Sequence, residues 1–209
     1  MPAAETIALF MAAALALNLT PGPDMMYVTA RSVADGRRAG LVAALGIGAG
    51  TLVHIAALAL GLAALLAAVP LAYDALRIAG ALYLVVIGLQ LLLRRPRADR
   101  GQRQAQALAP LGTVFAQAVL TDVFNPKVAL FFLAFLPQFV DQAAGPALAQ
   151  IVLLGLLFDV QGTVVNVAVA LLASGTTARL RANARAVSLL QRLTGALFVA
   201  LGARLAVAK

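Results

Sequence analysis

The 209-residue sequence contains no cysteine and no tryptophan, has a single histidine, and is only 11% charged. Without cysteine there is no thiol redox catalysis, iron–sulfur ligation or thiolate zinc site, and one histidine cannot form a histidine metal cluster. A soluble domain is about 25% charged and about 45–50% apolar. Here 63% of the residues are hydrophobic and the mean hydropathy is +0.96. The composition therefore predicts an integral membrane protein.

The apolar runs are long enough for several crossings of a hydrocarbon core about 30 Å thick. Six such runs are present, at residues 6–30, 41–68, 71–93, 113–137, 147–173 and 187–208. We expect an all-α integral membrane protein with six transmembrane helices in a single domain over residues 1–209. The run that begins at Ile7 could be a signal peptide, but no basic residue precedes it, so we interpret it as a retained first span.

The net charge of +8 arises mainly from alternate connectors between the spans. The connectors 31–40, 94–112 and 174–186 carry three, five and three of the 16 basic residues, whereas 69–70 and 138–146 carry none. Because Lys and Arg in short loops remain in the cytoplasm, these three connectors are predicted to be cytoplasmic and both termini to lie outside. The basic charge thus indicates topology, and nucleic-acid binding is not expected.

Spans one and four are interrupted by proline. The string Asn-Leu-Thr-Pro-Gly-Pro-Asp begins at Asn18, and the string Asn-Pro-Lys begins at Asn125. A proline inside a helix lacks the donor N–H and clashes with the preceding turn. We expect each break to begin a new helix, with Thr20 capping one that begins at Pro21, and Asn125 capping one that begins at Pro126.

The two breaks are three spans apart, so the two halves of the chain have opposite orientations. This pattern predicts two inverted three-helix repeats, residues 1–93 and 113–209, joined by the basic loop 94–112, with helices 1 and 4 broken. Two helix N-termini would then face one cavity at the bilayer midplane, which suits an anionic group such as a carboxylate. Backbone donors are few there, because Pro21 and Pro23 have no N–H.

Charged side chains near the breaks and in span five are costly in a bilayer and usually face a cavity. They are Asp24, Asp122, Lys127 and Asp159. We hypothesise that Lys127 and the half-helix N-termini hold a substrate carboxylate, while Asp24 or Asp122 meets an ammonium group or takes up a coupling proton. Alternatively, Asp122 and Lys127 neutralise each other, or Asp24 complements a helix dipole. Asp159, midway along span five, is a further proton-coupling candidate.

Span two carries a face of small residues and the one histidine. Gly46 and Gly50 are spaced for close helix packing, within one chain or between two copies, so a homodimer stays open. The Gly46–Gly50 string is no dinucleotide loop, because it lies inside an apolar run with no preceding strand. His54 is either a proton-relay group, given its ordinary pKa of about 6.5, or a hydrogen-bonded packing residue.

Three strings together resemble the lysine exporter (LysE/RhtB) superfamily, in its RhtB-type amino-acid exporter branch. They are the first-break string, Gly46-x-x-x-Gly50-x-x-x-His54, and Asn125-Pro126-Lys127 followed by Phe135-Leu136-Pro137-Gln138-Phe139. The resemblance covers essentially the whole chain. It implies a bacterial inner-membrane exporter of amino acids or close derivatives, such as threonine, homoserine, homoserine lactone, leucine or lysine, driven by the proton motive force. It matches Asn18, Thr20, Pro21, Gly22, Pro23, Asn125, Pro126 and Lys127 to the family's motifs.

Other function classes are less well supported by these residues. A membrane enzyme would need a nucleophile with its base, and His54 has no evident serine or aspartate companion in its own span. A lipid scramblase or membrane assembly factor could also contain proline-broken segments. The expected partners are a small amino-acid substrate, protons and the bilayer, and no cofactor is expected. The sequence leaves open the particular substrate and the coupling ion.

Overall fold

The computed structural model describes residues 2–68 and 109–173, together with isolated positions within 78–93 and 189–203. Within these residues every regular element is a helix, which confirms the all-α expectation. Apart from those isolated positions, the predicted spans at 71–93 and 187–208 lie outside the described residues, as do the basic connectors at 94–108 and 174–186.

Two long, unbroken helices form the framework. Helix α3 (Arg37–Ala68) and helix α7 (Ala147–Ala173) are each long and apolar enough to cross a membrane. At about 1.5 Å per residue, either exceeds the thickness of the hydrocarbon core. They pack against each other, and α3 also packs along α5 (Leu111–Val123). They correspond to the predicted spans two and five.

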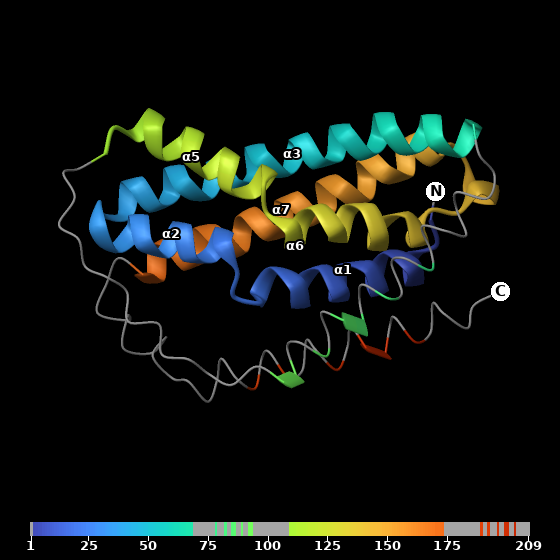
Figure 1. Ribbon diagram of the computed structural model, residues 1–209, viewed down its shortest axis with the longest axis horizontal. Coiled ribbons are helices and arrows are strands. Elements are labelled where there is room, and N and C mark those ends of the chain that lie inside the picture. Colours follow the sequence, from blue (N-terminus) through green and yellow to red (C-terminus); the bar gives the residue numbers. More distant parts are fainter. Residues whose placement is uncertain are drawn as a thin grey trace.

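The two proline-containing spans are bent, as predicted. Helix α1 (Ala4–Leu19) meets α2 (Pro23–Ala34) at 50°, and α5 meets the helical segment Pro126–Phe139 at 44°. Figure 1 shows both bends near the middle of the molecule. If each bent pair is one span, the described residues contain four candidate spans, and otherwise two.

The first break differs in detail from the prediction. Helix α2 begins at Pro23 with Gly22 as its N-cap, so the expected Thr20 cap and Pro21 start are wrong. Thr20 instead ends α1, and its hydroxyl donates to the carbonyl of Ala16 over 2.7 Å. The cause is Pro23, because the residue before a proline is pushed out of the helical region. Gly22 is accordingly extended, with φ −152° and ψ −175°.

The second break follows the prediction. Asn125 is the N-cap of α6 (Pro126–Leu130), and its side-chain oxygen accepts from the backbone N–H of Lys127 at 3.0 Å. The chain continues as a π-helical turn (η1, Phe131–Phe135) and two 3₁₀ turns (η2, Leu136–Phe139; η3, Gln142–Ala144). Regular α-helix cannot continue through Pro137, which has no N–H to give the carbonyl of Leu133.

The first predicted connector, 31–40, is mostly helical. Arg31 lies in the last turn of α2, where a cation favours the helix dipole, and Arg37 already begins α3. The turn between them is made possible by Gly36, whose φ of 85° suits glycine.

The two bent rods run antiparallel and are held by two separate apolar clusters. Phe10 on α1 contacts Phe139 with ring centroids 5.3 Å apart, whereas Tyr27 on α2 bonds to Val114 on α5. The cluster on the α1–α6 side is rich in phenylalanine, and that on the α2–α5 side is built from valine, isoleucine and alanine. In both bent rods the break falls between the residues of the two clusters. The fold therefore has a polar layer between two apolar ones.

Candidate functional site

The two helix breaks meet in this polar layer. The side-chain amide of Asn125 donates a 2.6 Å hydrogen bond to Oδ2 of Asp24. Both residues are buried, with 1% and 7% of their surface exposed. A carboxylate and an amide at this depth are stable only if they find partners, and here each break supplies the partner for the other.

Lys127 crosses from the second break to the first. Its ammonium group donates to the backbone carbonyls of Leu17 and Thr20, at 3.2 and 3.1 Å. The Leu17 carbonyl would normally accept from the N–H four residues later, but that residue is Pro21. It accepts instead from the Thr20 N–H at 3.0 Å, beside the Lys127 ammonium. A Cβ at Gly22 would lie 3.1 Å from the ammonium nitrogen, so glycine leaves room for the lysine. The first break thus presents a carbonyl site for a cation.

Asp122, at the end of α5, faces helix α3. Its Oδ2 accepts from the Thr51 hydroxyl at 3.3 Å, and its side chain is almost fully buried. Nε2 of His54 lies 3.1 Å from the backbone oxygen of Asp122 and 3.9 Å from Oδ2. The ring of His54 also stacks on Phe132 at 5.8 Å. His54 therefore touches both the polar layer and the aromatic cluster, and both of its predicted roles remain compatible with this position.

Glycines of α3 let α5 approach closely. A Cβ at Gly46 would lie 2.6 Å from that of Ala118 and 2.7 Å from the carbonyl oxygen of Phe115. A Cβ at Gly50 would lie 2.7 Å from Cβ of Asp122. These contacts are within one chain and bring Asp122 against α3.

Asp159, on α7, faces α3, and Asn18, near the end of α1, faces α7. Asp159 accepts from Thr163 one turn later at 3.4 Å, and its carboxylate lies beside Gly48. Asn18 packs against Gly162, and within the described residues its buried amide nitrogen has no hydrogen-bond partner. The assignment of these two residues to the site stays a prediction.

Lys127 was expected to lie with two helix N-termini, and its contacts differ from that expectation. The ammonium lies at the C-terminal carbonyls of α1, and the Lys127 backbone N–H is already used by the Asn125 cap. Asp24 occupies the first turn of α2, where a carboxylate complements the dipole. The binding of a substrate carboxylate by these groups therefore stays a prediction.

A polar network between α2 and α5 was not anticipated from the sequence. Arg31 donates to Gln117 at 2.7 Å and to the Tyr27 hydroxyl at 3.2 Å, and it pairs with Asp35 at 3.0 Å. Tyr27 in turn donates to the carbonyl of Val114. The spacing of Tyr27, Arg31 and Asp35 by four residues could have indicated a shared helix face, but no pattern pointed to Gln117.

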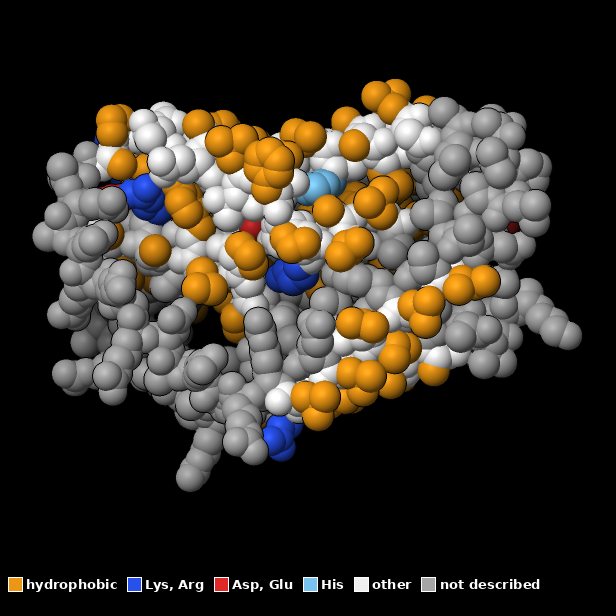
Figure 2. Space-filling view, in the orientation of Figure 1, with side chains coloured by type: hydrophobic (Ala, Val, Ile, Leu, Met, Phe, Trp, Pro, Cys, Tyr) orange, Lys and Arg blue, Asp and Glu red, His pale blue; other side chains and the backbone are white. Residues whose placement is uncertain are grey.

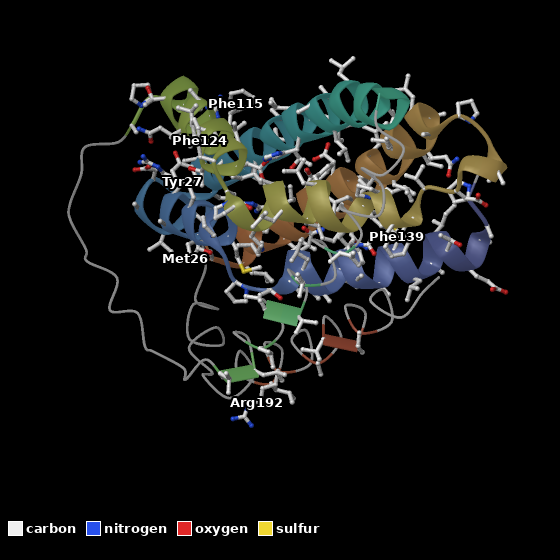
Figure 3. The ribbon with its side chains drawn as sticks, turned by 45° about the vertical axis from the view of Figure 1, so that its right-hand side comes forward. Met26, Tyr27, Phe115, Phe124, Phe139 and Arg192 are labelled. Atoms are coloured by element: carbon white, nitrogen blue, oxygen red, sulfur yellow. The ribbon has the colours of Figure 1, made fainter. Side chains whose placement is uncertain are left out.

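Figures 2 and 3 show where these groups lie in the molecule. Figure 2 shows a small group of charged and imidazole side chains near the middle of one face, surrounded by hydrophobic side chains. Figure 3 shows Tyr27 and Phe139 on opposite sides of this middle region. The exposed hydrophobic residues, among them Leu60, Phe124 and Val160, suit contact with lipid.

Comparison with known proteins identifies the family to which the chain belongs. A family model described as LysE type translocator matches residues 15–209. The leucine efflux protein of Salmonella typhimurium is 30% identical over 135 residues, 65% of this chain and 63% of that protein. The leucine efflux protein of Klebsiella pneumoniae is 28% identical over 197 residues, 94% of this chain and 92% of that protein.

An uncharacterized membrane protein of Pseudomonas aeruginosa is 36% identical over 201 residues, 91% of this chain and 89% of that protein. The match thus spans less than two thirds of the Salmonella relative but nearly all of the other two. No solved structure matches the chain. Because the family match covers residues 15–209, the chain belongs to the family of LysE type translocators.

Proposed function

We propose that the protein is a secondary active exporter that carries amino acids or close derivatives out of the cytoplasm across the bacterial inner membrane. The observation that carries the proposal is the joining of the two breaks by Asn125 and Asp24. Discontinuous helices that meet inside a transporter expose backbone carbonyls and N–H groups at one site. We extend this to six spans in two inverted repeats, with both termini outside, as the basic connectors predict.

The groups around the breaks suit a zwitterion. Carboxylates of Asp24 and Asp122 can accept from an ammonium group, and Lys127 can pair with a carboxylate. We assign substrate binding to both break motifs, namely Asn18, Thr20, Pro21, Gly22, Pro23, Asp24, Asn125, Pro126 and Lys127. Relatives that carry the name leucine efflux protein support an amino-acid substrate.

Proton coupling is assigned to the buried carboxylates. Asp122 is almost completely buried, and one of its oxygens has no hydrogen-bond partner among the described residues. For a buried carboxylate without a full set of partners, the protonated form costs less free energy than the charged form. Such a group can therefore take up a proton during the transport cycle. Asp24, Asp159 and His54 are the other candidates, and His54 is the one that touches Asp122.

The proposal is tested with purified protein in proteoliposomes that have an imposed pH gradient. A panel of labelled amino acids, including leucine, threonine, homoserine and lysine, is offered on the side that corresponds to the cytoplasm. We expect uptake or release that depends on the gradient, and a large loss in Asp24→Asn. Asp141→Asn, an exposed carboxylate outside the polar layer, is the matched control. Vesicles that move labelled lipid but no amino acid would instead indicate a scramblase.

A further inference from the structure

The end of α1 is a site for a positive charge. The carbonyls of Leu17 and Thr20 both accept from one ammonium group, that of Lys127, and the Leu17 carbonyl also accepts from the Thr20 N–H. The C-terminal end of a helix carries a partial negative charge, and prolines at 21 and 23 remove N–H groups that would otherwise bond to the carbonyls of this last turn. A cation is therefore the expected occupant, whichever molecule supplies it.

Acceptors exceed donors around this site. Asp24 accepts from Asn125, and Asp122 accepts from Thr51, each through Oδ2. The Oδ1 atom of each carboxylate is buried and has no hydrogen-bond partner in residues 2–68 and 109–173. Buried carboxylate oxygens normally have partners, so these two atoms indicate a ligand that donates. An ammonium group has three donors and fits that need.

The site is poorer in donors for an anion. Helices α2 and α6 both begin with a proline, and the backbone N–H of Lys127 is used by the Asn125 cap. The strongest donor near the breaks is the Lys127 ammonium itself, and it is engaged by the α1 carbonyls. A substrate carboxylate can gain this partner only if the ammonium leaves those carbonyls.

We propose that Lys127 acts as a tethered substitute for the substrate's ammonium group and exchanges with it. On binding, the ammonium of the amino acid takes the carbonyls of Leu17 and Thr20 and the unpaired oxygen of Asp24. The displaced Lys127 turns to the substrate carboxylate. The flexible four-carbon stem of lysine allows this movement, and Gly22 leaves the space for it. This inference rests on the proposed amino-acid substrate.

The exchange explains why a substrate would need both charges. An amine without a carboxylate would displace Lys127 and leave it without a new partner. An acid without an amine would offer Lys127 a partner but leave the carbonyl site empty. In either case one buried polar group is left unsatisfied, which costs affinity.

The experiment measures equilibrium binding to detergent-purified protein. The probes are the amino acid exported fastest in the panel above, its decarboxylated amine and its deaminated acid; for leucine these are isoamylamine and 4-methylpentanoate. In the natural protein, both analogues should bind about tenfold or more weaker than the amino acid. In Lys127→Met, the amine should bind about tenfold tighter than in the natural protein, and the amino acid about tenfold weaker, a shift of about 1.4 kcal/mol each way.

Two further variants make the outcome decisive. Gly22→Ala places a methyl group 3.1 Å from the Lys127 nitrogen, so it should shift both affinities in the same directions by a smaller factor, even if Lys127→Met does not fold. Arg38→Met removes an exposed cation of α3 and should change neither affinity.

The exchange is overturned if Lys127→Met binds the amino acid as tightly as the natural protein does. It is also overturned if Lys127→Met or Gly22→Ala binds the amine more weakly than the natural protein does. Neither result would contradict the proposed export of amino acids. If the natural protein exports no amino acid, the proposed function itself is wrong and the exchange falls with it.

Discussion

Asp24 and Asn125 lie 101 residues apart in the sequence and are joined by a 2.6 Å hydrogen bond. The bond ties the start of α2 to the cap of α6, so each break stabilises the other. Among the residues that the structure describes, the other Asp24 oxygen has no hydrogen-bond partner. The pair is therefore both a structural link and the place where a polar substrate would be recognised.

Asn125→Ala should destabilise the protein. The change removes the cap on Lys127 and leaves Oδ2 of buried Asp24 without its donor. We expect a loss of about 2–4 kcal/mol in the free energy of unfolding, measured by denaturation in detergent. Asp141→Ala is the control, because it removes a side-chain cap from the exposed turn η3 only, and should cost about 1 kcal/mol or less. Equal losses in both variants would argue against a special role for the Asn125–Asp24 bond.

Gly46→Ala should push α3 and α5 apart. The added methyl group would lie 2.7 Å from the Phe115 carbonyl, which is backbone and cannot move aside alone. We expect a destabilisation of about 1–3 kcal/mol and a lower melting temperature. Gly61→Ala on the same helix is the matched control, since a Cβ there meets nothing within 4 Å. It should be neutral or slightly stabilising, and a melting temperature lowered as much as in Gly46→Ala would refute the close-approach account.

Cross-linking α2 to α5 should stop export. Arg31 and Gln117 hold these helices together on one side of the breaks, and a substrate that enters from that side must separate them. The chain has no cysteine, so Arg31→Cys with Gln117→Cys gives a clean pair for a short bifunctional thiosulfonate. We expect export to fall to background and to return on reduction. Export that continues through the cross-link would show that α2 and α5 need not part.

The predicted orientation of the chain in the membrane can be determined by labelling single cysteines introduced into the cysteine-free sequence. Arg38→Cys lies in the first basic connector and Ala143→Cys in the turn between α6 and α7. If basic connectors are cytoplasmic, an impermeant thiol reagent added to intact cells should label Ala143→Cys but reach Arg38→Cys only after lysis. The opposite labelling pattern would show that the predicted topology is inverted. It would also contradict the assignment of the first connector to the cytoplasm.

Sequence reasoning anticipated the helix breaks because proline chemistry is local. Pro126 begins a helix and Asn125 caps it, as the pattern predicted. It misplaced the start of α2 by two residues, because the effect of Pro23 on Gly22 outweighed the capping tendency of Thr20. Local rules have no means of predicting where a flexible side chain goes after folding. The Lys127 ammonium was expected near helix N-termini and instead lies at the carbonyls of α1.

The most direct test of the account asks whether an amino acid occupies the junction of the breaks. Thr20→Cys puts a small thiol at the buried end of α1, and Thr113→Cys puts one at the exposed start of α5. The rate of modification by a small thiosulfonate is measured with and without saturating substrate in protein that still exports. We predict that substrate slows the reaction at Thr20→Cys and leaves Thr113→Cys unchanged. Equal rates with and without substrate at Thr20→Cys would contradict a binding site at the breaks.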